Sequence, residues 1–151
     1  MWLCVPFSVG ATPNSEYLIK AAFIYNFTKF VEWPNADKTI NLCLVGSHGY
    51  DGTIKQIEKR SNAKIRYQVF EGNTESYKCH TQIYDQSPSS IPQKPNLLTI
   101  GEGKDFIAQG GIIAFVPKGG KVKFIINLAA AKLAGLKMNP QLLEIADEVV
   151  R

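Results

Sequence analysis

The chain has 151 residues, of which 45% are hydrophobic and 20% are charged, and its formal net charge at pH 7 is +4. This length and composition are typical of a single globular domain that can bury a sizeable core. Lysine and arginine are scattered along the chain, which argues against a nucleic-acid partner, and no apolar run after residue 11 is long enough to span a membrane.

The first eleven residues, MWLCVPFSVGA, are apolar and uncharged, and they end in small residues. Val9-Gly10-Ala11 is similar to a signal-peptidase cleavage site, although the run lacks the basic start of a complete secretory signal. We interpret residues 1–11 as the remnant of a secretory signal and residues 12–151 as the mature domain of an exported protein. The alternative is an ordinary N-terminus of a cytoplasmic protein.

A long helix is predicted from Glu16 to Pro34, because the residue before a proline resists helical angles. One apolar stripe with helical spacing contains Tyr17, Ala21, Ile24 and Val31, and a second contains Phe23, Phe27 and Phe30. A helix that is apolar on most sides must be covered from more than one direction. Either the core surrounds this helix, or a second copy or a partner completes its burial. The second alternative makes Phe23, Phe27 and Phe30 the predicted dimer or partner interface.

A buried strand is predicted for Ile40 to Gly46, followed by a glycine-containing loop and a short helix from Thr53 to Arg60. Phosphate-binding loops have the same order of elements, so Ser47, His48 and Gly49 are candidate ligand-binding residues. The loop contains neither GxGxxG nor GKS/T, however, and a plain strand-to-helix turn is the favoured interpretation.

The remainder of the chain contains further short strands and helices. Apolar and polar residues alternate in Lys64–Phe70, which predicts a strand at an edge of a sheet with one solvent-exposed face. Other strands are predicted at 79–84, 96–100, 112–116 and 121–126, the last two forming a hairpin. Helical segments are predicted at 106–109, 127–134 and 139–149. The sequence therefore predicts a single compact α/β domain with a mixed sheet of five to six short strands, helices packed on it and a long aromatic N-terminal helix.

Cys43 and Cys79 form an even pair once Cys4 is removed with the signal. In an oxidising compartment such a pair often closes a disulfide bond, and the alternative is two unrelated thiols. The chain offers little for catalysis, because it has only two histidines, His48 and His80, and no HExxH or GxSxG motif. We predict no catalytic residues, no cofactor and no metal site. His48 remains as a weak candidate for a catalytic base.

Four stretches occur in an order and spacing that match the sequence pattern of a single family: KAAFIYNFTKFVEWP, LCLVG, GEGKDFIAQGGIIAFV and KVKFIINLAAAKLAGLKMNPQLLEIA. Together they resemble the YfiR-like family of periplasmic proteins, from about Glu16 to Val149. The resemblance implies that Cys43 and Cys79 match the family's strand cysteine and its later partner, which favours a bridge. This sequence has no second cysteine pair near its C-terminus, so any redox tuning that depends on such a pair is absent.

The resemblance also implies a function. Members of the family are small periplasmic α/β domains, often dimeric, without enzymatic activity. The best-known member restrains an inner-membrane diguanylate cyclase by binding the periplasmic portion of that enzyme, and an outer-membrane lipoprotein can sequester the regulator. Other members lie beside histidine kinases or other sensor proteins. A regulator of cyclic di-GMP signalling, and hence of biofilm formation, is therefore the first hypothesis for this YfiR-like domain.

A second hypothesis is a solute-binding protein that presents a small molecule to a sensor, with the loop from Gly46 to Gly52 as the rim of its pocket. A third, for which the sequence offers least, is an enzyme that uses His48.

Overall fold

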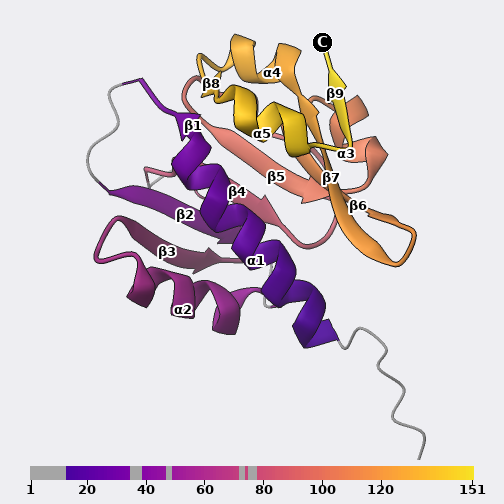
Figure 1. Ribbon diagram of the computed structural model, residues 1–151. Helices are drawn as coiled ribbons and strands as arrows, with labels where there is room; N and C mark the ends of the chain where they lie inside the picture. The colour runs from indigo at the N-terminus through magenta and orange to yellow at the C-terminus, as the bar shows by residue number, and fades with distance from the viewer. Residues whose placement is uncertain (1–12, 35–38, 47–48, 72–73, 75–77) are drawn as a thin grey trace, which may run out of the picture.

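The computed structural model describes residues 13–34, 39–46, 49–71, 74 and 78–151. The elements of this part of the chain are, in order, α1 (Pro13–Phe30), β1 (Val31–Glu32), β2 (Ile40–Val45), α2 (Asp51–Arg60), β3 (Ile65–Phe70), β4 (Thr81–Tyr84), β5 (Leu98–Glu102), α3 (Lys104–Ala108), β6 (Ile113–Lys118), β7 (Lys121–Asn127), α4 (Leu128–Leu133), β8 (Lys137–Met138), α5 (Pro140–Ile145) and β9 (Glu148–Val150). The predicted single α/β domain is confirmed (Figure 1).

Seven of the strands form one mixed sheet in the order β3-β2-β4-β5-β6-β7-β9. The first five strands of this order are parallel, whereas β7 is antiparallel to β6 and parallel to β9. All six strands predicted from the sequence are present in it. The sheet is larger than the predicted five to six strands because Glu148–Val150, which overlaps the end of the last predicted helix, pairs with β7 as β9.

The helices cover the two faces of the sheet unequally (Figure 1). The main core joins one sheet face to α1, α2, α4 and α5, and it includes Ile24, Phe27, Ile54, Leu128 and Leu142. A smaller cluster on the other face contains Tyr84, Ile91, Phe106 of α3 and Ala114. The sheet therefore has one thickly covered face and one face that is covered mainly by α3 and the chain between β4 and β5.

The first helix ends earlier than predicted. α1 stops at Phe30, because Val31 and Glu32 leave the helix and pair with Met138 and Lys137 as the two-stranded sheet β1–β8. The backbone N–H of Asn139 donates to the carbonyl oxygen of Phe30, which fixes this end of the helix. Tertiary pairing thus ends the helix one turn before the proline that local sequence rules favour.

Local signals place three other features correctly. β3 lies at the edge of the sheet, and its buried and exposed residues alternate over the first half of the strand. β6 and β7 form the predicted hairpin, and Gly119 and Gly120, both with positive φ angles, make its tight turn. The side chain of Asn127 accepts a hydrogen bond from the backbone N–H of Ala130, as expected of a helix cap.

Candidate functional site

The first helix presents apolar side chains to solvent. Leu18 is 52% exposed and Ile19 is 47% exposed, and Ala22 on the next turn is also exposed. We call these three residues the α1 surface. Leu18 and Ala22 lie one turn apart on the same side of the helix, and Ile19 exposes further apolar area beside them. Soluble proteins often keep exposed apolar surface of this kind for contact with another molecule.

A groove of about 340 Å³ continues the α1 surface toward α2. Leu18, Ala22 and Tyr25 of α1 form one side, and Ile57 and Arg60 of α2 form the other. Ile57 and Tyr25 are half-buried against the main core, so the floor of the groove is fixed by the fold. The groove is therefore a preformed, partly apolar surface between two helices.

Arg60 gives the α2 side of this groove a positive charge. Arg60 is exposed, and Lys55 and Lys59 are exposed on the same helix but outside the lining of the groove. Lys29 of α1 is also exposed, and its ammonium group lies 4.2 Å from the centre of the Tyr25 ring. An apolar centre with a charged rim is the usual anatomy of a protein–protein interface, and here the charge favours an acidic partner.

Comparison with known proteins identifies the family. Residues 17–147 match the sequence model of proteins described as YfiR/HmsC-like. The chain belongs to the YfiR/HmsC-like family. No curated protein matches the chain. The family consists in general of periplasmic regulatory proteins without catalytic activity, and membership is consistent with a part in diguanylate cyclase signalling. Among the described residues, none of the helices combines the length and apolarity that crossing a membrane requires.

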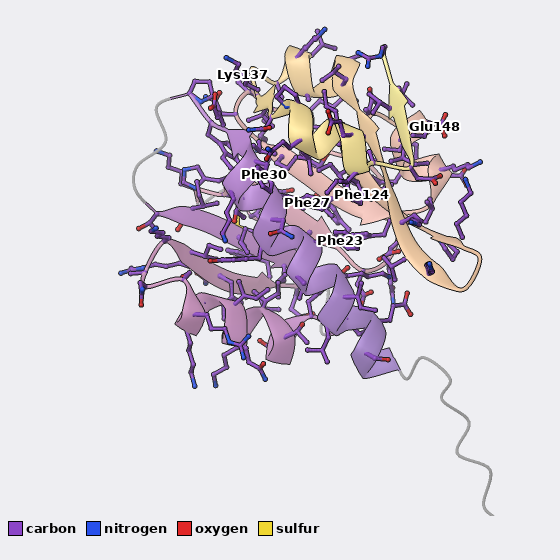
Figure 2. All side chains as sticks on the ribbon, in the orientation of Figure 1. Phe23, Phe27, Phe30, Phe124, Lys137 and Glu148 are labelled. Carbon is purple, nitrogen blue, oxygen red and sulfur yellow. A yellow bond between two sulfur atoms is a disulfide. The ribbon has the colours of Figure 1, made fainter. Side chains whose placement is uncertain are left out.

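The three phenylalanines predicted as interface residues of this YfiR/HmsC-like protein lie on successive turns of α1, with Phe124 of β7 beside them (Figure 2). Phe27 is completely buried, and the centre of its ring is 5.0 Å from that of Phe124 and 6.0 Å from that of Phe115. Phe27 thus has no surface left for a partner. Phe23 and Phe30 are half-buried against the same core and keep part of their surface, so their role at an interface stays a prediction.

The cysteine pair forms a disulfide bond between β2 and the segment before β4, with 5.9 Å between the Cα atoms of Cys43 and Cys79. Cys43 is completely buried and lies opposite Gln82 of β4 in the sheet. The bond of this YfiR/HmsC-like protein therefore links the middle of β2 to the chain just before the neighbouring strand β4.

The loop after β2 is described only in part. Ser47 and His48 lie outside the described residues. Gly49 packs directly against the ring of Tyr17, and a Cβ atom at this position would overlap that ring. This close approach explains a glycine at position 49 by packing, and it leaves the predicted role in ligand binding untested.

A cluster of polar side chains lies on the α1 side of the strand ends. The hydroxyl group of Tyr17 donates to the carboxylate of Asp85, which follows β4, at 2.5–2.7 Å. The ammonium group of Lys20 lies 2.8 Å from carboxylate oxygens of both Glu16 and Glu102. Lys20 is 6% exposed, so both carboxylates are needed to compensate for the burial of its charge.

The pKa values of Lys20 and Glu102 in this cluster are both raised. Burial acts to lower the pKa of Lys20, but its hydrogen bonds to Glu102 and Glu16 outweigh this effect and raise the pKa. Burial raises the pKa of Glu102, although its hydrogen bond to Lys20 acts in the opposite direction. Each charged group of the cluster forms an ion pair or a hydrogen bond with a neighbouring side chain. The cluster therefore links α1 to the ends of β4 and β5.

His80 is the histidine that lies in the described part of this YfiR/HmsC-like chain, and His48 lies outside it. His80 is buried, and its Nδ1 atom accepts a hydrogen bond from the backbone N–H of Asn41, which gives it a structural task. No three His, Cys, Asp or Glu side chains in the described part of the chain are arranged to hold a metal ion.

The buried tyrosines predict a loss of stability at alkaline pH. Burial raises the pKa of Tyr84 to about 12, and burial also raises the pKa values of Tyr17 and Tyr50, in Tyr17 together with its hydrogen bond to Asp85. A pKa raised by folding contributes stability that is complete below the unfolded pKa of about 10 and is lost as the pH rises toward the folded value. We therefore expect the free energy of unfolding, measured with urea, to fall between about pH 10 and pH 12.

Tyr84→Phe is the matched variant for this measurement, because it removes one ionising group and keeps the ring. Its loss of stability over the same pH range should be smaller than that of the native protein. An equal decline in both proteins would contradict the assignment to Tyr84.

Proposed function

We propose that this protein is a non-enzymatic periplasmic regulator that binds and restrains a membrane-bound signalling protein, above all a diguanylate cyclase. The α1 surface carries this proposal. Leu18 and Ile19 are exposed in a protein whose other α1 side chains are largely packed against the sheet and neighbouring helices. Covering these side chains in a complex removes apolar area from water, which stabilises the complex by about 25 cal/mol per Å² before the costs of association.

The groove indicates the chemistry of the partner. Leu18, Ala22 and Ile57 give it apolar walls, and Arg60 places a positive charge on its α2 side. A partner segment that complements it is an amphipathic helix with apolar side chains on one face and acidic side chains beside them. The expected partner is the periplasmic portion of an inner-membrane diguanylate cyclase or of another sensor protein. An outer-membrane lipoprotein that competes for the regulator is the expected release signal.

A deletion experiment tests the physiological part of the proposal. Intracellular cyclic di-GMP is measured in strains with and without the gene. A rise on deletion, reversed when the native gene is restored, is the expected result for a protein that restrains a cyclase. Unchanged cyclic di-GMP would reject the cyclase as its target.

A charge placed on the α1 surface should abolish partner binding without unfolding the protein. Leu18→Asp puts an unpaired carboxylate into an interface that excludes water, and a change at such a centre commonly costs 2 kcal/mol or more, roughly a thirtyfold loss of affinity. Binding to the isolated periplasmic domain of the cyclase is measured by calorimetry. The matched control is Leu133→Asp, because Leu133 is 86% exposed on α4 and lies outside the α1 surface.

Comparison of Leu18→Asp with Leu133→Asp distinguishes loss of the partner interface from a general effect of an added surface charge. The proposal expects weak binding for Leu18→Asp, native binding for Leu133→Asp and native thermal stability for both. Native affinity in Leu18→Asp would remove α1 from the partner interface. The mass in solution identifies self-association: a change from dimer to monomer in Leu18→Asp, with cyclase binding kept, would assign the α1 surface to a homodimer.

A further inference from the structure

A second pocket lies at the point where the strand order of the sheet reverses. From β2 the chain moves to β3 on one side, and it then returns to β4 on the other side and continues toward β5 and β6. β2 and β4 are parallel, so their carboxyl ends lie side by side. In open parallel sheets, ligands bind outside the carboxyl ends of the strands at such a reversal. A pocket of about 520 Å³ lies there, within the size range of small-ligand sites.

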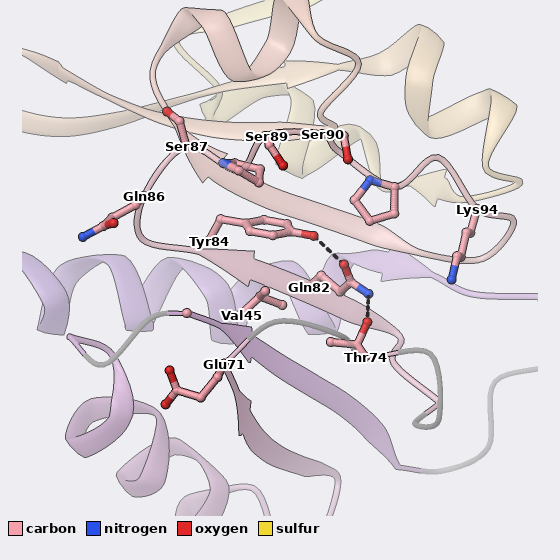
Figure 3. A pocket seen from close by; sticks show the side chains of 13 residues that line it. Val45, Glu71, Thr74, Gln82, Tyr84, Gln86, Ser87, Ser89, Ser90 and Lys94 are labelled. Atoms are coloured by element: carbon pink, nitrogen blue, oxygen red, sulfur yellow. Dashed lines mark hydrogen bonds between the residues drawn. The ribbon is translucent and has the colours of Figure 1, made fainter.

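Two buried polar side chains form the floor of this pocket. Gln82 is 3% exposed and Tyr84 is 5% exposed. The Tyr84 hydroxyl donates to Gln82 Oε1 at 2.5 Å, and Gln82 Nε2 donates to the hydroxyl of Thr74 at 2.8 Å (Figure 3). A carboxamide has two N–H donors and two acceptor positions, so with respect to the described residues Gln82 keeps one of each for a ligand. The two bonds also hold the amide in one orientation before any ligand arrives.

The outer wall of the pocket is rich in hydroxyl groups. The segment after β4 supplies Ser87, Ser89 and Ser90, and the hydroxyl groups of Ser89 and Ser90 lie on the side that faces Tyr84 and Gln82 (Figure 3). Pro88 and Pro92 of the same segment add rigid apolar surface. Hydroxyl and amide groups both donate and accept hydrogen bonds, which matches a ligand whose own groups do the same.

The charges of the described residues that line the pocket balance. These charged residues are Glu71 and Lys94, which have opposite signs. A pocket of this kind has no net attraction for an anion or a cation, and its specificity depends on hydrogen bonds and on the fit of apolar surfaces. A neutral ligand with several hydroxyl groups and a less polar C–H face satisfies both requirements.

We propose that this pocket binds a neutral sugar of one or two rings. The sugar hydroxyls replace water at Gln82, Thr74 and the serine wall, and its C–H face contacts Val45 and the two prolines. The pocket shares the sheet face of Tyr84 and α3, whereas the α1 surface lies on the opposite face. A bound sugar therefore leaves the α1 surface open, and the proposal stands independently of the regulatory partner.

Thermal unfolding of the full chain with defined solutes tests this proposal. The probes are glucose, N-acetylglucosamine and maltose, with glutamate and inorganic phosphate as charged comparisons. A sugar in roughly hundredfold excess over its Kd stabilises the folded protein and should raise its Tm by several degrees. Calorimetry then measures the affinity of the sugar that gives the largest increase. No increase with any of the three sugars, or an increase with glutamate or phosphate instead, would overturn the proposal.

Variants locate the binding site. Gln82→Leu removes the oriented amide and should weaken sugar binding at least tenfold, because a site built for hydrogen bonds discriminates strongly when they are lost. Ser89→Val and Ser90→Val change exposed residues, so they should weaken binding while the fold stays intact. Gln141→Leu is the matched control, since Gln141 is exposed on α5, outside the pocket. Native sugar affinity in the folded Ser89→Val and Ser90→Val proteins would place the sugar elsewhere.

Discussion

Removal of the disulfide bond should lower the free energy of unfolding by roughly 4 kcal/mol. The Cys43→Ala/Cys79→Ala double variant opens a loop that spans a sequence separation of 36 residues. In the chain-entropy account of disulfides, an open loop of this length gives the unfolded chain much more conformational freedom and so favours unfolding. A domain of this size is commonly stable by about 5–15 kcal/mol, so the change is a large part of its total stability.

Urea denaturation of the native protein with and without a reductant measures this contribution. The reductant should lower the native midpoint to that of the double variant, and it should leave the double variant unchanged. Mass spectrometry of the native protein should show it lighter by the two thiol hydrogens until it is reduced. A native midpoint that does not respond to reductant, with the bond shown to be open, would contradict the predicted stabilisation.

Replacement of Phe27 by alanine should destabilise the protein by about 3–5 kcal/mol, because it leaves a cavity in the centre of the core. Phe27 is completely buried, and its ring packs against Phe115 and Phe124 from two strands of the sheet. Contacts between aromatic rings add to the loss of buried apolar area. The variant should therefore unfold at a much lower urea concentration.

The matched control for Phe27→Ala is Leu18→Ala on the same helix. Leu18 is half-exposed, so this variant should change the free energy of unfolding by less than about 1 kcal/mol. The mass in solution distinguishes core from interface: Phe27→Ala should partly unfold and should not yield a stable monomer from a dimer. A folded, fully stable Phe27→Ala protein would show that the core accommodates the loss and would contradict the expected cavity.

Much of the fold follows from local signals, because apolar runs and alternation mark each of the six longer strands. The strands β1, β8 and β9 could not be predicted in this way. Each has only two or three residues and exists through a partner distant in sequence, as in the pairing of Val31 with Met138. The early end of α1 has the same origin, since its last carbonyl group is bonded to Asn139.

The sites were less accessible to sequence reasoning. The apolar residues of α1 lie on most sides of the helix. The sequence therefore indicated that the helix must be buried from several directions, but not which side stays exposed. Packing of Phe27 against Phe124 fixes the rotation of the helix and leaves Leu18 and Ile19 on the outside. The pocket for which we propose a sugar depends on the order of strands in the sheet and on two segments without periodicity. Local sequence patterns therefore did not indicate a role for Gln82.

The placement of the α1 surface within the molecule affects how the protein should be attached in binding assays. Leu18 and Ile19 lie near the beginning of α1, whereas the C-terminus lies at the opposite end of the molecule (Figure 1). An affinity tag, dye or sensor chip joined just before α1 would crowd these side chains and reduce access of a partner. The same group joined after Arg151 would leave the α1 surface pointing away from the support, so the C-terminal end is the suitable point of immobilisation.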